Sequence, residues 1–233
     1  GTAKPTEKDR AGVPHHLIDG GGANEKFSAS DYEALARPVC ERLLAENKNP
    51  VVCGGTGFYI QSLLFSRSLG NVGASEEVRR KYERMEIELG KEAVFARLQA
   101  VDSESAAKLH PNDVKRVIRA LEIFELTGKK KSEQEDGFVA RYPYVAVAFD
   151  YPREELYARI DARVEQMLQD GLVEEVQKIL ADGTSEQSQS MQGIGYKEVV
   201  QFLKKEISYS TMRDIIKQNS RNYAKRQITF FKK

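Results

Sequence analysis

The stretch Val51-Val52-Cys53-Gly54-Gly55-Thr56-Gly57-Phe58-Tyr59 decides the fold. A short apolar run after Pro50 predicts a buried strand, and the apolar segment 58–65 predicts a helix directly after it. Glycines between a strand and a helix let the backbone approach a ligand closely, and the free amides of the helix then face that ligand. The stretch therefore predicts a phosphate or pyrophosphate site in an α/β protein, with Gly54, Gly55 and the Thr56 hydroxyl at the ligand. The alternative is an ordinary strand-to-helix turn in which Thr56 is the N-cap.

Composition sets the class of protein. The chain has 233 residues, 40% of them hydrophobic and 30% charged, which is typical of a globular protein with one good core and a smaller second one. No apolar run reaches the roughly 18 residues of a membrane span. The two cysteines, Cys40 and Cys53, lack metal-binding spacing, so we expect a reducing, cytoplasmic setting, with Cys53 packed in the buried strand. The net charge of +1 excludes a global attraction to nucleic acid, so such binding requires local patches.

The C-terminal segment is one such patch. No acidic residue follows Asp214, whereas Lys217, Arg221 and Lys225 are spaced four apart and share one helix face. Tyr223, Phe230 and Phe231 alternate with these cations and with Arg226, a mixture that suits RNA because phosphates bind the charges and bases stack on the rings. The alternative is a solvated basic helix at the end of a domain.

A second basic patch lies in 110–128. Asn112 or Asp113 is placed to cap a helix that Gly128 ends. Its first turns carry Lys115, Arg116 and Arg119, and cations there oppose the helix dipole. This small cost indicates use of the cations for an anion such as a phosphate backbone, although an ordinary surface helix remains the alternative.

The rest of the pattern completes the fold. The apolar run 144–149 predicts a second strand, and uninterrupted apolar strands separated by helices predict a parallel sheet covered on both faces. Pro152 begins a predicted helix through Leu168, while 75–100 predicts a charged helix and 101–127 further helix. Arg159 and Arg163 lie one turn apart where such a helix meets a ligand, within reach of a pyrophosphate. The alternative for them is a surface ion pair with Glu155 or Asp161.

Taken together, the segments resemble one family, the tRNA dimethylallyltransferases, also called tRNA isopentenyltransferases. The resemblance covers nearly the whole chain, in the family's order, and the set is specific although each piece is weak. The matching pieces are Gly1-Thr-Ala-Lys-Pro-Thr6, Gly12-Val-Pro-His-His-Leu-Ile-Asp19, Gly54-Gly-Thr-Gly-Phe-Tyr59, His110-Pro-Asn-Asp113, Lys115-Arg-Val-Ile-Arg-Ala-Leu-Glu122, Glu125-Leu-Thr-Gly-Lys129, Leu156-Tyr-Ala-Arg-Ile160, Ser190-Met-Gln-Gly-Ile-Gly-Tyr-Lys-Glu198 and Ser220-Arg-Asn-Tyr-Ala-Lys-Arg-Gln-Ile-Thr229.

The resemblance implies a fold and a reaction. The fold is a P-loop NTPase-like α/β core, residues 1–76 and 143–233, with a helical insertion, residues 77–142, that contacts tRNA. The reaction transfers a dimethylallyl group from dimethylallyl diphosphate to the exocyclic N6 amine of the adenosine 3′ of the anticodon in tRNA. Magnesium is the implied cofactor, the tRNA anticodon stem-loop is the partner, and a monomer is expected.

The resemblance also assigns residues. Thr56 lines the reaction channel, Arg163 faces the pyrophosphate, and Gly54, Gly55 and Arg159 contact the substrate; no residue is assigned to a metal. The residues matching tRNA-binding positions are Arg79, Lys115, Arg116, Arg119, Gln192, Lys197, Arg221, Lys225 and Arg226.

One part of the family pattern has no counterpart. The family's phosphate-binding loop and its general-base aspartate align before Gly1, so no residue here is assigned these roles, and we expect the intact protein to carry such a strand and loop.

Two other classes of protein remain as alternatives. An adenylate prenyltransferase or nucleotide kinase of the same superfamily explains the glycine turn but not two basic patches. A non-catalytic RNA-binding fragment explains the patches but not the turn.

Overall fold

The computed structural model describes residues 4–18, 20–66, 73–133 and 139–232. The chain divides into two compact units, residues 1–63 with 143–233 and residues 64–142, and each is described by itself. The insertion predicted at 77–142 starts inside the first helix of the second unit, whereas the unit itself begins at Leu64.

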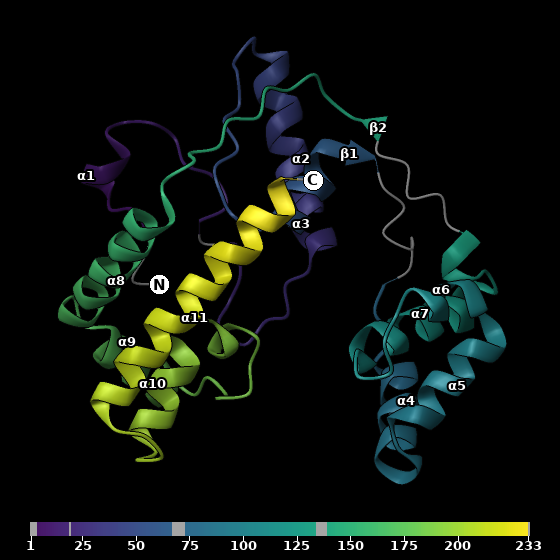
Figure 1. Cartoon of the computed structure of the whole chain (residues 1–233). Helices are drawn as coiled ribbons and strands as arrows, with labels where there is room; N and C mark the ends of the chain where they lie inside the picture. Colours follow the sequence, from purple (N-terminus) through teal and green to yellow (C-terminus); the bar gives the residue numbers. More distant parts are fainter. Residues whose placement is uncertain (1–3, 19, 67–72, 134–138, 233) are drawn as a thin grey trace. The chain divides into compact units, whose positions relative to one another are not determined.

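The regular elements that the structure describes in the first unit are all helices, joined by long loops (Figure 1). Its core joins the helices after residue 150, and the fully buried side chains there include Leu172, Val176, Met191 and Met212. Burying each such side chain contributes about 1.5–3 kcal/mol, so this helical cluster stabilises the unit. The elements are α1 (Glu7–Arg10), α2 (Ala29–Ala45), α3 (Gly57–Leu64), α8 (Arg153–Gln169), α9 (Leu172–Ala181), η2 (Ser190–Gln192), α10 (Tyr196–Leu203) and α11 (Tyr209–Phe231).

Side-chain caps fix where several of these helices begin. Ser28 accepts a hydrogen bond from the Asp31 amide at the start of α2, and Asp31 in turn accepts one from the Ser28 amide. The Ser208 hydroxyl accepts a hydrogen bond from the Thr211 amide at the start of α11. Pro152, predicted as the first helical residue, is instead the N-cap of α8, so the helix begins one position later, at Arg153.

The two predicted strands are wrong for the described chain. Residues 51–53 and 144–149 are extended but belong to no ladder, and their side chains are exposed, with Val51 at 89% and Val145 at 91%. Cys53, predicted to be packed, is exposed as well. A strand requires neighbouring strands that satisfy the hydrogen bonds of its backbone. An apolar run shows that a segment can be buried, but it does not show which segment it packs against. The parallel sheet is therefore not formed among the described residues.

The second unit is a small helical domain with its own core. Tyr82, Val94, Leu98 and Leu121 are buried together at the centre of its helices. The helix predicted for 75–100 is two helices, because Gly90 adopts φ +87°, a conformation that glycine tolerates and that ends the first one. The elements are β1 (Phe65–Ser66), α4 (Glu76–Leu89), α5 (Lys91–Val101), α6 (Ser103–Ala107), α7 (Val114–Thr127), η1 (Lys131–Glu133) and β2 (Val139–Ala140), with β1 and β2 antiparallel.

Asp102 gives this second unit a predicted pH dependence. Burial by itself raises the pKa of this carboxyl, but hydrogen bonds from the Ser105 and Ser132 amides, 3.0 Å each, outweigh burial and lower the pKa from 3.8 to about 2. Because the folded-state pKa is the lower one, the stabilisation is present well above pH 3.8 and is lost as the pH falls through about 2. At about 1.4 kcal/mol per pKa unit it amounts to about 2 kcal/mol at neutral pH.

We expect Asp102→Asn to lower the free energy of unfolding by about 2 kcal/mol at pH 7, and by about half as much at pH 3. Urea denaturation followed by circular dichroism at the two pH values measures the difference. The exposed Glu83 on α4 supplies the control Glu83→Gln. A loss for Asp102→Asn that is the same at both pH values would contradict the assigned role of the carboxylate.

Candidate functional site

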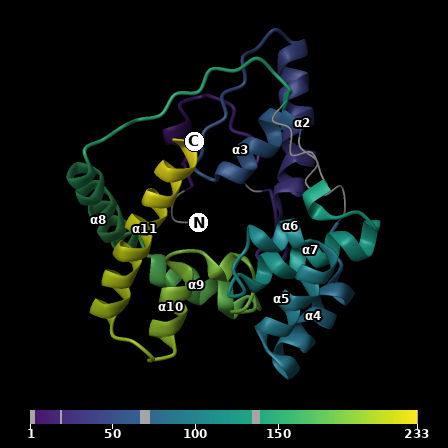
Figure 2. The same ribbon diagram turned by 45° about the vertical axis from the view of Figure 1, so that its right-hand side comes forward.

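The glycine turn before α3 is packed against the C-terminal half of α11 (Figures 1 and 2). A Cβ at Gly55 would lie 1.9 Å from Gln227 Nε2, and a Cβ at Gly57 would lie 2.1 Å from the Phe230 ring. Real Cβ atoms do not approach that closely, so a side chain at Gly55 would displace the end of Gln227, and one at Gly57 would displace the Phe230 ring. The Phe58 and Phe230 rings meet edge to face at 5.4 Å on the same side. The structure thus joins the predicted ligand turn to the predicted RNA-binding helix.

Thr56 lies exposed at the centre of this contact. Its backbone carbonyl accepts hydrogen bonds from the amides of Tyr59 and Ile60, which places it at the start of α3. Its hydroxyl lies 3.4 Å from the Tyr223 hydroxyl on α11. The alternative role of Thr56, an N-cap whose side chain binds a helix amide, is therefore not what its hydroxyl does here. The hydroxyl is available at the surface of the turn, where the sequence predicts the reacting groups.

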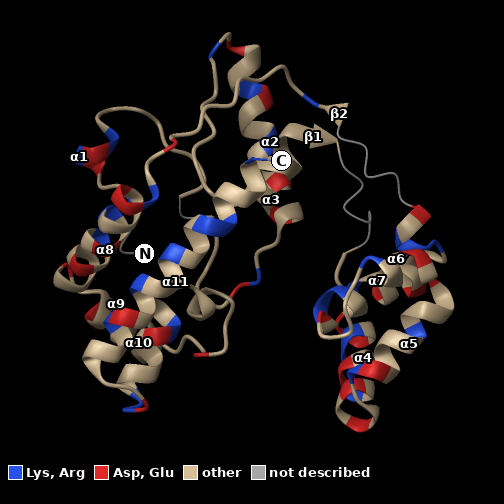
Figure 3. Ribbon diagram, viewed as in Figure 1, with Lys and Arg blue, Asp and Glu red and all other residues tan. Residues whose placement is uncertain are grey.

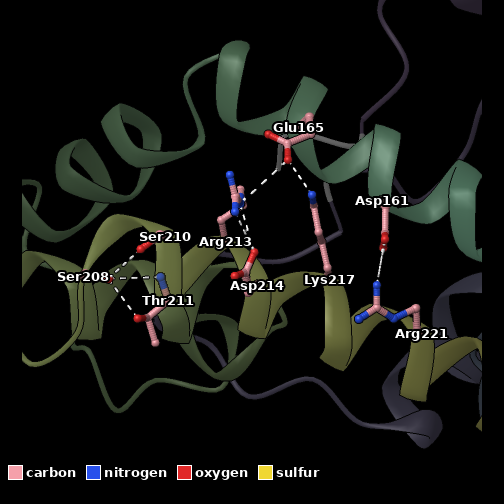
Figure 4. A network of polar contacts seen from close by, with 9 residues as sticks. All are labelled: Asp161, Glu165, Ser208, Ser210, Thr211, Arg213, Asp214, Lys217 and Arg221. Atoms are coloured by element: carbon pink, nitrogen blue, oxygen red, sulfur yellow. Dashed lines mark hydrogen bonds and ion pairs between the residues drawn. The ribbon is translucent and has the colours of Figure 1, made fainter.

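The basic face of α11 divides into two parts. Lys217 pairs with Glu165 of α8 at 2.5 Å, and Arg221 donates to both oxygens of Asp161 at 2.7 Å (Figure 4). Glu165 and Asp161 are one turn apart on α8, so the two pairs link facing helices. Arg221, predicted to bind tRNA, is thus engaged by a bidentate carboxylate contact that holds α11 to α8.

Lys225 and Arg226 follow these pairs in the sequence of α11. Figure 3 shows that basic residues recur along this helix. Within the described residues neither cation makes an ion pair, and both are exposed. The Arg226 guanidinium lies 5.6 Å from the centre of the Tyr223 ring. Among the described residues of α11, the cations without an ion pair are consequently these two, in its C-terminal part.

The two arginines of α8 differ in their surroundings. Arg159 lies 4.6 Å from the centre of the Tyr151 ring and 4.0 Å from Glu155, so the predicted surface pair with Glu155 exists in a loose form. Arg163 is exposed and, in the part of the chain that the structure describes, makes no ion pair. No hydrogen bond among the described residues joins Arg163 to the glycine turn, so the predicted pyrophosphate role of both arginines stays a prediction.

Gln192 and Lys197 line one shallow cavity of about 400 Å³ in the first unit. The side-chain amide of Gln192 donates to the backbone carbonyl of Glu186 at 3.2 Å. Lys197 lies 3.6 Å from the buried carboxylate of Glu198. Glu198 also accepts hydrogen bonds from the Gly195 amide and from Asn219 of α11, 2.7 Å each. The two predicted tRNA-binding residues therefore share one wall that is fixed to α11.

In the second unit, Arg79 and Arg119 share one buried carboxylate. Glu122, with 0% of its side chain exposed, accepts hydrogen bonds from Arg79 Nε at 2.9 Å, from the Ser75 amide at 2.8 Å and from Arg119. Burial raises the pKa of this carboxyl, but the hydrogen bonds from Arg119, Ser75 and Arg79 prevail and lower it below its usual range. Both predicted RNA contacts are thus held in place by a group inside the domain.

Lys115 and Arg116 are different, because both are exposed on the first turn of α7. Arg116 forms an exposed pair with Asp113 at 3.1 Å, and Lys115 makes no ion pair in the described part of the chain. Asp113 is the N-cap of α7, one of the two predicted caps, but its side chain makes no capping hydrogen bond. Unlike Arg79 and Arg119, these two cations are exposed to an external anion.

The described residues were also searched for metal ligands and for membrane-spanning helices. Among them, no group of three or more His, Cys, Asp and Glu side chains is placed to hold a metal ion, so we assign the implied magnesium no ligand in this chain. No described helix is long and apolar enough to cross a membrane.

The comparisons with known proteins agree with the resemblance over the whole sequence. The family model described as IPP transferase matches residues 1–233. The chain belongs to the IPP transferase family. A tRNA dimethylallyltransferase from Alkaliphilus oremlandii is 39% identical over 235 residues, covering 100% of this chain and 75% of that protein. Another, from Caldanaerobacter subterraneus subsp. tengcongensis, is 40% identical over 237 residues with the same coverage.

Solved structures of IPP transferases match as well. The full-length tRNA isopentenylpyrophosphate transferase of Bacillus halodurans is similar with a TM-score of 0.69 at 38% identity, over 99% of this chain and 72% of that one. A eukaryotic dimethylallyltransferase described as acting on tRNA is similar with a TM-score of 0.75 at 26% identity, over 97% of this chain and 58% of that one. The helical frame of this chain is therefore that of its family.

Two features of this chain were not predicted from the sequence. Glu122 was not singled out, although it follows Arg119 at a spacing of three, which places both on one helix face. Gln227 was not singled out either, although Tyr223, Gln227 and Phe230 fall on one face of α11. In both cases the spacing in the sequence shows that the residues share a helix face, but only the structure shows what that face contacts.

Proposed function

We propose that this chain acts as a tRNA dimethylallyltransferase, transferring the dimethylallyl group of dimethylallyl diphosphate to the N6 amine of the adenosine 3′ of the anticodon. The observation that carries the proposal is the seating of the Thr56 turn on α11, the helix that also carries the exposed Lys225 and Arg226, in a chain that matches its family from end to end. A site for a diphosphate substrate and cations for RNA are thereby supported in one place.

The chemistry assigns each residue a role. The amine nitrogen attacks the allylic carbon, a carbon–nitrogen bond forms, and the carbon–oxygen bond to pyrophosphate breaks. The nitrogen gives its proton to a base, a role to which no residue of this chain is assigned. A weak nucleophile must be held in line with the carbon, and the adenine must leave its stack to reach it. In this proposal Thr56 positions the reacting groups, while Arg163, aided by Arg159, neutralises the departing pyrophosphate. The amides of the turn at Gly54 and Gly55 approach the same phosphates.

Two further elements of the proposal concern the frame and the cofactor. The exposed apolar segments 51–53 and 144–149 become strands of a P-loop NTPase-like parallel sheet, with neighbouring strands that the described residues do not supply; their exposure supports this. Magnesium accompanies the diphosphate in this proposal.

Incorporation of labelled dimethylallyl diphosphate into bulk tRNA tests the function. Transfer to tRNA supports it. Transfer to adenosine monophosphate, but not to tRNA, replaces it with an adenylate prenyltransferase. Binding of tRNA without transfer to either acceptor replaces it with a non-catalytic RNA-binding protein.

The second basic patch supports a separate prediction. We expect Lys115→Ala with Arg116→Ala to weaken tRNA binding and to lower the slope of log affinity against log salt by roughly one unit per lost phosphate contact. Arg119 stays unchanged, because its removal would disturb Glu122. Binding of dimethylallyl diphosphate should not change. Titrations of tRNA at several salt concentrations measure the slope.

Lys108, an exposed cation paired with Glu104 at 2.8 Å on α6, provides the control variant Lys108→Ala. If the double variant binds tRNA with the salt slope of the unmodified protein, Lys115 and Arg116 are only a solvated surface, and the insertion meets tRNA elsewhere.

A further inference from the structure

The contact between the glycine turn and α11 is built residue by residue. Gly55 touches Gln227, the Thr56 hydroxyl meets the Tyr223 hydroxyl at 3.4 Å, and Gly57 touches Phe230. Positions 223, 227 and 230 follow one another at spacings of four and three, so they share one helix face. Consecutive residues of the turn are therefore held by one rigid surface, which we call the α11 seat: Tyr223, Gln227 and Phe230.

Tyr223 is the polar member of the α11 seat that reaches the exposed hydroxyl of Thr56. Its own side chain is partly exposed, at 38%, so the two hydroxyls meet at the surface of the turn and not in the core. Its ring is held from outside by the Arg226 guanidinium. A threonine hydroxyl rotates freely unless a partner fixes it, and in the structure this partner is the Tyr223 hydroxyl.

We propose that Tyr223 is a positioning residue for prenyl transfer: its phenolic hydroxyl orients the hydroxyl of Thr56 toward the reacting groups. The inference rests on the proposed function for its kinetic consequence, and on the α11 seat alone for its structural one. Orientation of a reacting contact affects the chemical step more than the binding of either substrate.

Tyr223→Phe removes one oxygen and keeps the ring and its contact with Arg226. We expect the single-turnover transfer rate to fall about two- to tenfold, the effect of one lost neutral hydrogen bond, with KM for both substrates and the melting temperature unchanged. Tyr209→Phe is the matched control, because Tyr209 is an exposed tyrosine at the start of the same helix. Its rate should equal that of the unmodified enzyme.

Combining the variant with Thr56→Ala tests whether the two hydroxyls act together. If Tyr223 acts through Thr56, adding Tyr223→Phe to Thr56→Ala causes no further loss. Additive losses, or an unchanged rate for Tyr223→Phe alone, would overturn the proposal.

A measurement without activity separates this proposal from the proposed function. In protein labelled at threonine methyl groups, NMR couplings report the χ1 rotamer of Thr56. We expect one rotamer in the unmodified protein and averaging in Tyr223→Phe. Unaltered couplings overturn the positioning role even if transfer is never observed, whereas altered couplings in an inactive protein uphold the α11 seat and reject the transferase.

Discussion

Replacement of Thr56 with alanine is expected to slow the transfer of the dimethylallyl group to tRNA by about ten- to a thousandfold, the range for loss of one positioned polar contact. Thr56→Ser keeps the hydroxyl and should keep most of the activity. The structure supports this prediction because the Thr56 hydroxyl is exposed at the turn and binds no amide of α3. Single-turnover transfer at low temperature measures the chemical step.

Stability is the competing explanation, since loss of an N-cap costs about 1 kcal/mol. In the structure the cap contact comes from the Thr56 backbone carbonyl, which alanine retains, so the melting temperature should change little. Thr229→Ala is the control, because it deletes a hydroxyl that bonds only within α11, to the Lys225 carbonyl. A Thr56→Ala variant with a lowered melting point and the unmodified single-turnover rate would make Thr56 a structural residue only.

The helices were predictable because their signals are local. The spacing of apolar residues and the glycines at 128 and 171 lie within the segments they organise, although the same kind of signal at Gly90 was passed over in the helix predicted for 75–100. The glycine turn was predictable for the same reason, and its helix begins at Gly57. The strands predicted at 51–53 and 144–149 do not form in the described chain, because a strand depends on neighbours that its own residues do not encode.

The candidate site was predictable as a set of residues but not as a set of contacts. Lys217, Arg221 and Lys225 share one face in the sequence, yet the carboxylates of α8 engage the first two and leave the third. That division depends on which helix packs opposite, at a sequence separation of 60 residues for Arg221 and Asp161. Spacing identifies a cation, whereas only packing shows whether the cation is already paired.

Removal of the buried carboxylate of Glu122, which pairs with Arg79 and Arg119, is expected to have the largest effect on stability. Glu122→Ala should lower the free energy of unfolding by about 3 kcal/mol, near the lower end for a broken buried ion pair. The lower end applies because the Arg79 and Arg119 side chains that lose their partner are 36% and 30% exposed and remain partly hydrated. The Ser75 amide, which opens α4, loses its acceptor as well.

Glu122→Gln retains one acceptor oxygen but places an amide NH₂ group against a donor, so we expect a smaller loss of about 1–2 kcal/mol. Because the folded-state pKa of Glu122 lies below its ordinary value of 4.5, the stabilisation is complete well above pH 4.5 and is lost as the pH falls below it. The gap between the unmodified protein and Glu122→Gln should therefore narrow in acid.

Urea denaturation followed by circular dichroism suits the measurement, because the chain has no tryptophan. Hydrogen exchange of peptides from α4 and α7 localises the effect to the second unit. The exposed Glu83 of α4 provides Glu83→Ala as a control, which should change stability by less than about 0.5 kcal/mol. Equal stability of Glu122→Ala and Glu83→Ala would mean that Arg79 and Arg119 hold their places without the carboxylate, and that Glu122 does not organise this cationic surface.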